Sequence, residues 1–281
     1  MLSDIKVRDL SYKETFNTGF EIFRENFKAI AILAIIVYIP LLIVERLIVL
    51  GSLIDYLTLM GLNNFDSGYI SYGMVLQTIF ERIMYMSAAG TLVSDAALMR
   101  ALYTAAGAVF VSSVVLVPLL SSGSTYLTLN TVEKKESSVE SMLSVAVSNI
   151  GKTTVTVFLA SVLTGIGILL FVLPGLYLSV GFSFVIPAVI VTGKWGMSAL
   201  RESFDIVRGR WFKTLFFLIL SGAFKYLFEY LSSFVIRGVF AVFPRNVITD
   251  SITTIMFGIL FLYFVFVECL WFINKHFVRK M

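Results

Sequence analysis

The feature that most limits what this chain can fold into is an uncharged stretch that runs from Thr153 to Thr192. A helix needs roughly 20 apolar residues to cross the ~30 Å hydrocarbon core of a bilayer. The stretch is too long for one such helix, and its only strong break is Pro174-Gly175, a pair typical of turns. The sequence therefore predicts two membrane-spanning helices here, joined by a tight hairpin on the outer side.

Composition and further apolar runs extend this prediction to the whole chain. Of the 281 residues, 58% are hydrophobic and only 14% are charged, whereas soluble domains average ~45–50% apolar and ~25% charged residues. We therefore predict an all-α integral membrane protein that forms a single membrane domain over residues 1–281. Its six transmembrane helices are expected near 29–48, 101–127, 153–172, 176–193, 214–236 and 252–273.

The basic residues predict how the chain is oriented. Cytoplasmic loops of membrane proteins carry an excess of Lys and Arg. Most of the 22 basic residues fall in the amino-terminal segment, in the loops before the third and fifth spans, and in the carboxyl-terminal tail. Both termini are therefore expected in the cytoplasm. The net charge of +4 arises from this asymmetry and does not indicate nucleic-acid binding.

Residues 51–100 are the part of the chain with the weakest pattern. Their apolar runs are interrupted by charged residues such as Asp55, Glu81 and Arg82. We expect an extracytoplasmic insertion with one or two amphipathic helices lying on the outer surface, and a re-entrant element is the alternative.

Three segments share one pattern, in which apolar residues are separated by steps of four, three and four just before an odd-numbered span. Such steps place four side chains on one helical face. This predicts interfacial helices whose apolar face lies in the acyl boundary, and an ordinary helix with a core-facing stripe is the alternative for any one of them. The stripes are Phe16, Phe20, Phe23 and Phe27; Val139, Leu143, Ala146 and Ile150; and Leu200, Phe204, Val207 and Trp211.

Recurrence of the pattern predicts an internal repeat of an interfacial helix followed by a helical hairpin. The three copies cover about 12–129, with the 51–100 insertion, 137–193 and 197–274. A lysine follows each stripe within two residues, and Arg208 and Arg210 lie within the third; these basic residues are expected to meet the head groups of membrane lipids, in particular anionic ones. These candidate lipid-facing residues are Lys28, Lys152, Arg208, Arg210 and Lys213.

The letters AVSNIGKTT, from Ala146 to Thr154, resemble a phosphate-binding loop with alanine in the first glycine position. Such a loop requires a buried strand before it and a soluble helix after it. Here a surface helix is expected before it and an uncharged span follows directly. The sequence therefore does not predict ATP binding.

Ionisable residues inside a span are costly, by ~3 kcal/mol each at the bilayer centre, and are therefore candidate functional residues. Lys225 and Glu229 lie one helical turn apart on the fifth span and can pair, while Glu268 lies on the sixth. A structural ion pair, with Glu268 reaching for the interface, is one interpretation. A proton- or ion-coupled pathway is the other.

No constellation of residues indicates an enzyme, a cofactor or a catalytic residue. The chain has one cysteine, Cys269, and one histidine, His276, so a zinc site built from Cys and His cannot be assembled. The count does not exclude a metal site built only from carboxylates.

The stretch LPGLYLSVGFSFVIPAVIVTGKWGMSALRESFDIVRGRWFKTL, from Leu173 to Leu215, resembles a known pattern. It is similar to the membrane domain that precedes some bacterial glycerophosphodiester phosphodiesterases, and to YciC-type membrane proteins. The match rests on the Pro174-Gly175 turn, on "FSFVIP", on the following helix and on the six-span layout. It implies a bacterial multi-pass protein of the cytoplasmic membrane and carries over no catalytic residue.

Two functions follow as hypotheses. The first is a non-enzymatic membrane protein that binds lipid or a membrane protein partner, in envelope maintenance or in resistance or immunity to a membrane-active agent. The second is a transporter or permease subunit that uses the Lys225/Glu229 pair.

Overall fold

The computed structural model describes residues 5–44, 48, 51–61, 72–91, 95–239 and 247–280. Within these ranges the regular structure is helical, with no strand. Five helices are long and apolar enough to cross a membrane, and a sixth candidate is the pair Tyr12–Glu25 and Phe27–Ile43, which is bent by 81°. The protein is therefore an all-helical membrane protein. The five candidate spans are Ala96–Val132, Ile150–Leu170, Val172–Thr192, Trp211–Phe228 and Ile255–Arg279.

The helices follow one another along the chain in this order. They are α1 (Tyr12–Glu25), α2 (Phe27–Ile43), α3 (Gly51–Leu59), α4 (Tyr72–Ala88), α5 (Ala96–Val111), a π-helical turn (Ser112–Leu116), α6 (Val117–Val132), α7 (Val139–Ser148), α8 (Ile150–Leu170), α9 (Val172–Gly181), α10 (Val185–Thr192), α11 (Met197–Val207), α12 (Trp211–Val239) and α13 (Val247–Lys280). The predicted first span, 29–48, extends beyond α2 into residues outside the described part of the chain.

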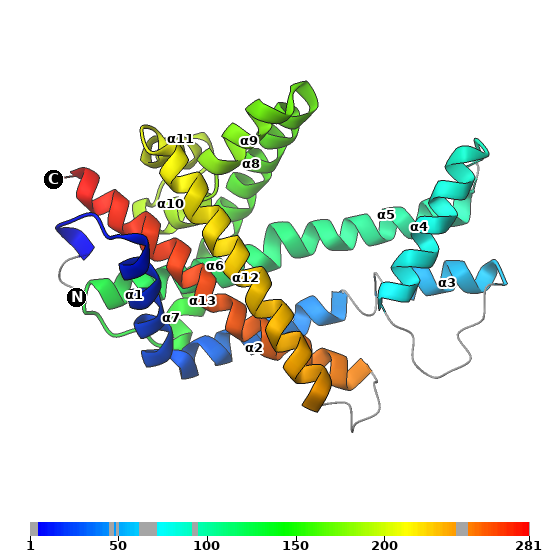
Figure 1. The fold of residues 1–281 in the computed structure, drawn as a ribbon, viewed down its shortest axis with the longest axis horizontal. Helices are drawn as coiled ribbons and strands as arrows, with labels where there is room; N and C mark the ends of the chain where they lie inside the picture. The colour runs from blue at the N-terminus through cyan, green and yellow to red at the C-terminus, as the bar shows by residue number, and fades with distance from the viewer. Residues whose placement is uncertain are drawn as a thin grey trace.

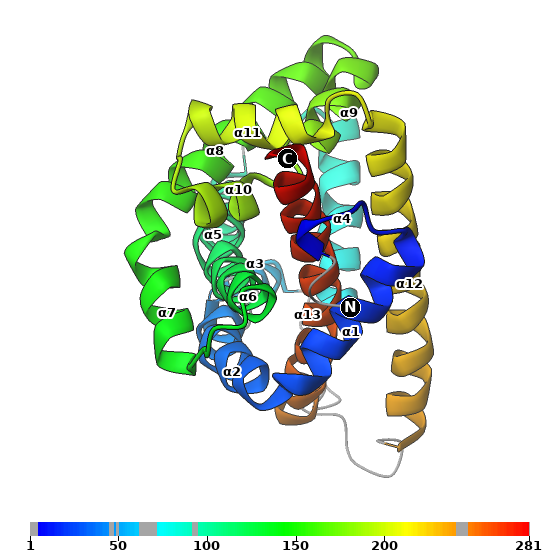
Figure 2. The same ribbon diagram turned by 90° about the vertical axis from the view of Figure 1, so that its left-hand side faces the viewer.

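The last helix, α13, forms the centre of the bundle, with α1, α2, α6 and α12 around it (Figures 1 and 2). Its side chains Phe266, Leu270 and Ile273 are fully buried. Helix α1 crosses α13 so closely that a Cβ on Gly19 would clash with the side chain of Val267. The two ends of the described chain lie at the same end of the bundle (Figure 1).

The α8–α9 hairpin turns at Phe171, not at Pro174-Gly175 as the sequence predicted. Phe171 has an extended backbone (φ −160°, ψ 145°), and α9 begins with the next residue. Pro174 therefore lies in the first helical turn, where its missing N–H does no harm. Gly175 lies against Ile168 of α8, because a Cβ at that position would be 2.6 Å from the Ile168 nitrogen. The glycine thus permits a close helix crossing and does not make the turn.

The candidate span Val172–Thr192 is broken between α9 and α10, a few residues before Pro187. Proline removes an N–H donor and disfavours the helical conformation in the residue before it. The hydroxyl of Ser203 on α11 donates to the carbonyl of Gly181 (2.7 Å) and accepts from the N–H of Phe184 (3.2 Å). A buried serine therefore satisfies backbone groups that the break leaves unpaired, as a membrane interior requires.

Helices α5 and α6 join into one helix of 37 residues, or ~55 Å, which is well beyond the ~30 Å hydrocarbon core. It begins at Ala96, within the segment predicted as an insertion, and α5 extends away from the bundle as an arm (Figure 1). Helices α3 and α4 lie at the far end of the arm, where the Tyr56 hydroxyl donates to Asp95 (3.0 Å). One or two helices were expected between 51 and 100; two are present, α3 and α4, and they pack in one cluster with α5.

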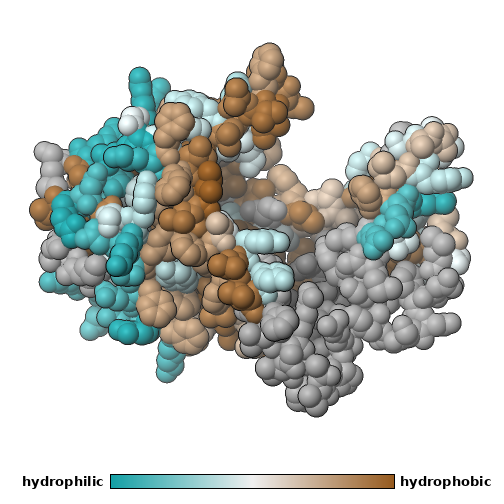
Figure 3. Space-filling model, viewed as in Figure 1, coloured by the Kyte–Doolittle hydropathy of each residue, from teal (hydrophilic) through white to brown (hydrophobic). Residues whose placement is uncertain are grey.

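The three predicted interfacial helices are α1, α7 and α11, and part of each apolar face packs on protein, while Phe20 and Phe27 of the first stripe are exposed. Leu200 and Val207 of α11, Ala146 of α7 and Phe23 of α1 are all buried. The expectation that the whole of each stripe lies among the lipid acyl chains is therefore wrong, because neighbouring helices cover these buried residues. Hydrophilic residues still gather at the end of the bundle that holds both termini, and an apolar band lies beside them (Figure 3).

Candidate functional site

The amino-terminal segment is fastened to α13 by one buried asparagine. Asn274 accepts a hydrogen bond from the Leu10 N–H (3.1 Å) and donates to the carbonyls of Ile5 (2.7 Å) and Arg8 (2.8 Å). A buried side-chain amide that uses both its oxygen and its nitrogen in this way fixes backbone position. The segment before α1 is therefore held beside the carboxyl-terminal helix.

This attachment places Asp9 between two cations from distant parts of the chain. Its carboxylate lies 3.0 Å from Arg210, just before α12, and 3.2 Å from Lys275 on α13. Partial burial alone would raise the pKa of Asp9, but the charge of Lys275 and the hydrogen bonds from Lys275 and Arg210 outweigh it and lower that pKa. Lys275 is itself buried, with its ammonium 4.3 Å above the Trp271 ring.

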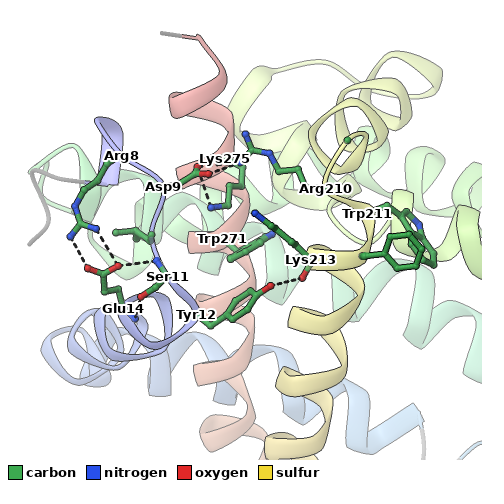
Figure 4. Close-up of a pocket in the computed structure, with 13 residues that line it drawn as sticks. Arg8, Asp9, Ser11, Tyr12, Glu14, Arg210, Trp211, Lys213, Trp271 and Lys275 are labelled. Carbon is green, nitrogen blue, oxygen red and sulfur yellow. Dashed lines mark hydrogen bonds and ion pairs between the residues drawn. The ribbon is translucent and has the colours of Figure 1, made fainter.

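A cleft of about 1060 Å³ opens at this ion cluster, between the start of α1, the start of α12 and the end of α13 (Figure 4). Its basic side chains outnumber its acidic ones, and aromatic rings line one wall. Tyr12 stacks on Trp271 (5.5 Å between ring centroids), and Trp271 stacks on Phe217 (4.4 Å). The charged and aromatic lining consists of Arg8, Asp9, Glu14, Arg210, Lys213 and Lys275 with Tyr12, Trp211, Phe212 and Trp271.

The first turn of α1 forms the fixed rim of the cleft. Ser11 and Glu14 form a capping box, in which each side chain accepts from the backbone N–H of the other. Arg8 holds the same glutamate through two contacts, of 2.7 and 3.2 Å. The hydrogen bonds from Arg8 and Ser11 lower the pKa of Glu14 to about 2. Glu14 is therefore ionised at neutral pH and keeps Arg8 in place.

Two groups at the cleft have no protein partner in the described part of the chain. The ammonium of Lys213 forms no ion pair or hydrogen bond there, while its backbone carbonyl accepts from the Tyr12 hydroxyl (3.2 Å). The indole N–H of Trp271 is buried and has no acceptor. Because α12 begins at Trp211, unpaired N–H groups of its first turn add positive potential at the cleft. The Lys213 ammonium and the first turn of α12 therefore offer donors and positive charge, the features that bind an anion.

Of the basic residues predicted to face lipid, the structure brings Arg210 and Lys213 together in the cleft. Arg208, Lys28 and Lys152 are exposed and do not line it. Lys28 and Lys152 lie in the first turns of α2 and α8. The phosphate-loop letters around Lys152 have a helix before them, where such a loop requires a strand.

The structure also shows how the ionisable residues of the spans lie. Glu268 accepts a hydrogen bond from Ser221 of α12 (3.2 Å), so it bonds to a neighbouring helix and does not reach for the interface. The ammonium of Lys225 lies 5.0 Å above the Phe261 ring and interacts electrostatically with Glu268. The side chain of Glu229 lies outside the described part of the chain, so its pairing with Lys225 stays a prediction.

Sequence reasoning missed the residues that complete the cleft, namely Arg8, Asp9, Tyr12, Trp271 and Lys275. The sequence does show one acid, Asp9, within a basic amino-terminal segment. Its partners Arg210 and Lys275 are about 200 or more positions away, so the sequence does not indicate the pairing. In the described residues no group of three or more His, Cys, Asp or Glu side chains could hold a metal ion.

Comparisons of the chain with models of known protein families, with curated protein sequences and with solved structures gave no match.

Proposed function

We propose that this chain is a non-enzymatic, multi-pass protein of the bacterial cytoplasmic membrane, and that it binds anionic lipid head groups on its cytoplasmic side. The cleft between α1, α12 and α13 carries this proposal. It combines an excess of basic side chains with the unpartnered ammonium of Lys213 and the unpartnered indole N–H of Trp271. It also lies at the end of the bundle where the basic segments of the chain meet, which suits a lipid phosphate at the membrane surface.

The proposed topology has six spans in three repeats, with both termini in the cytoplasm. Two hinges support the repeat. Asn26 links α1 to α2 and Asn149 links α7 to α8, with nearly equal backbone angles (φ −107°, ψ 14° and φ −100°, ψ 4°). Each asparagine side chain donates to the carbonyl four residues earlier, at 2.9 Å. In the third copy, Arg210 occupies the corresponding place before α12.

Labelling of single introduced cysteines tests this topology. The one native cysteine, Cys269, is buried, so a Cys269→Ala background suits a membrane-impermeant maleimide. Glu136→Cys, in the loop before α7, is expected to react only after the cells are permeabilised. Ala89→Cys, at the end of α4 on the arm, is expected to react in intact cells. The reverse pattern would overturn the orientation.

Lipid binding is tested on the full chain by native mass spectrometry after release from its own membrane in mild detergent. Arg210→Gln and Lys213→Gln are each expected to lower retention of anionic lipid about fivefold, because a basic side chain near a membrane surface contributes roughly 1 kcal/mol. Arg208→Gln and Lys152→Gln remove equal charge outside the cleft and are the matched controls. Equal losses in all four variants would show general electrostatic attraction and contradict a defined site.

A transporter or permease subunit is the second candidate, and one observation favours it. Lys225 lines a cavity of about 150 Å³ inside the apolar part of the bundle, together with Tyr38 and Ser121. An amine on an apolar span, beside a cavity and with the carboxylate of Glu268 on the neighbouring helix, is an arrangement that ion-coupled proteins use. Lys225→Met should then abolish an ion-dependent flux in proteoliposomes while the fold is kept. An unchanged flux would contradict the transporter function.

A further inference from the structure

An apolar groove continues from the basic cleft along the side of the bundle. It has a volume of about 750 Å³ and lies between α1, α12 and α13, and Ser11 and Tyr12 line both spaces. Lys13 and Asn17 are exposed residues at the α1 side of the groove. Its other lining is apolar and aromatic, namely Phe16, Leu220, Phe224, Leu227, Phe228, Leu231, Tyr263 and Phe264.

The lining of the groove is open to the side and fixed at its base. Phe224, Leu227 and Leu231 of α12 are 47%, 50% and 54% exposed. In a membrane such positions face acyl chains. At the base Phe264 is buried, and the Tyr263 hydroxyl donates to the Phe16 carbonyl (3.1 Å), which fastens α1 to α13. A chain can therefore enter from the bilayer without displacing the core.

The length of the groove matches one leaflet. From Leu220 to Leu231, α12 rises by ~16 Å at 1.5 Å per residue, and half of the ~30 Å hydrocarbon core is ~15 Å. Lys213 lies two helical turns before Leu220 in the direction of the cleft. The cationic groups are thus at the depth of the head groups when the groove is at the depth of the acyl chains.

We propose that cleft and groove form one two-part site for a single anionic glycerophospholipid of the cytoplasmic leaflet. Its phosphate lies in the cleft near Arg210, Lys213 and the Trp271 indole, and one acyl chain lies in the groove along α12. This inference rests on the proposed function, anionic lipid binding, and adds the chain subsite. Charge complementarity selects an anionic head group, and the leaflet-long groove selects an attached acyl chain over a free phosphate.

The test compares three probes on the full chain in detergent, by titration in native mass spectrometry. Dioleoyl phosphatidylglycerol carries both parts, dioleoyl phosphatidylcholine carries the same chains without net charge, and glycerol 3-phosphate carries the anion without chains. Leu227→Trp fills the groove at a position that is already exposed. Ile219→Trp is the matched control, because Ile219 is 58% exposed on the same helix and does not line the groove.

Leu227→Trp is expected to weaken phosphatidylglycerol binding at least tenfold, which corresponds to the loss of roughly two buried methylene groups. Ile219→Trp should leave that affinity unchanged, and neither variant should alter the binding of glycerol 3-phosphate. Equal affinities for the two tryptophan variants would overturn the chain subsite and leave head-group binding intact. Equal affinities of the native protein for lipid and glycerol 3-phosphate would identify a soluble phosphate as ligand. Equal affinities for phosphatidylglycerol and phosphatidylcholine would instead refute the proposed function.

Discussion

The carboxylate of Asp9 lies 3.2 Å from the ammonium of Lys275, and this ion pair joins the first residues of the chain to its last helix. The same carboxylate lies 3.0 Å from Arg210. An internal acid is therefore already paired with Arg210, a cation of the proposed phosphate site. In the proposed site Asp9 competes with the ligand and sets how tightly an anionic head group binds.

Asp9→Asn should strengthen the binding of phosphatidylglycerol, because the phosphate no longer competes with a carboxylate for Arg210. We expect a gain of about fivefold, the effect of roughly one unit charge near the membrane surface. Asp205→Asn is the control, since Asp205 pairs with Arg279 outside the cleft. Native mass spectrometry of both variants measures the effect, and an equal gain in the control would show a change in overall charge only.

The ion cluster around Glu202 should make the protein less stable in acid. Partial burial alone would raise the pKa of Glu202, but the hydrogen bond and charge of Lys194, with the charges of His276 and Arg279, lower it below 4.5. A carboxyl whose folded-state pKa is depressed stabilises the fold above its unfolded value, and this contribution is lost as pH falls through the folded value. The melting temperature should therefore fall as pH drops below about 4.5.

Glu202→Gln separates this cluster from the other acids of the chain. The variant should melt lower than the native protein at pH 7 and should lose less stability on acidification, as followed by tryptophan fluorescence in detergent. Glu140→Gln, which changes an exposed glutamate of α7, is the control. If the native protein and Glu202→Gln respond to acid in parallel, the pH dependence has another origin.

Local patterns were sufficient to predict the helical class and most helix positions. Apolar runs with few charges predicted 153–172, 214–236 and 252–273, and α8, α12 and α13 cover these segments almost completely. The places where the prediction was wrong depend on neighbours in space. The hairpin turns at Phe171, while Gly175 packs closely on Ile168. A glycine in a turn and a glycine at a helix crossing look alike in sequence.

The candidate site was less predictable than the fold. The sequence identified Arg210 and Lys213 as basic residues near an interface, because positive charge beside a span has a known preference. It could not show that Asn274 brings the amino-terminal segment to α13, which places Asp9 beside them. Side-chain contacts between distant positions leave no periodic pattern, so the cleft and the groove appear only once the helices are assembled.

Asn26 and Asn149 should contribute equally to stability if they are equivalent hinges. Each alanine substitution removes one hydrogen bond from the side chain to the carbonyl four residues earlier, worth roughly 1 kcal/mol. We expect each variant to lower the melting temperature in detergent by roughly 2–4 °C. Asn17→Ala, an exposed position of α1, is the control. A large loss in one hinge variant and none in the other would argue against equivalent repeats.

Gly175→Ala should damage the α8–α9 hairpin far more than an equivalent change one turn from the contact. The added Cβ would lie 2.6 Å from the backbone nitrogen and 2.7 Å from the Cα of Ile168, and backbone atoms cannot move aside as a flexible side chain can. Overpacking of this kind typically costs about 1–3 kcal/mol. Gly165→Ala is the matched control on α8, because no atom lies within 4 Å of its Cβ position. There alanine should be neutral or slightly stabilising, since it favours helix over glycine. Melting temperatures and folded yields of the two variants decide the point, and similar values for both would mean that the two helices do not cross at Gly175.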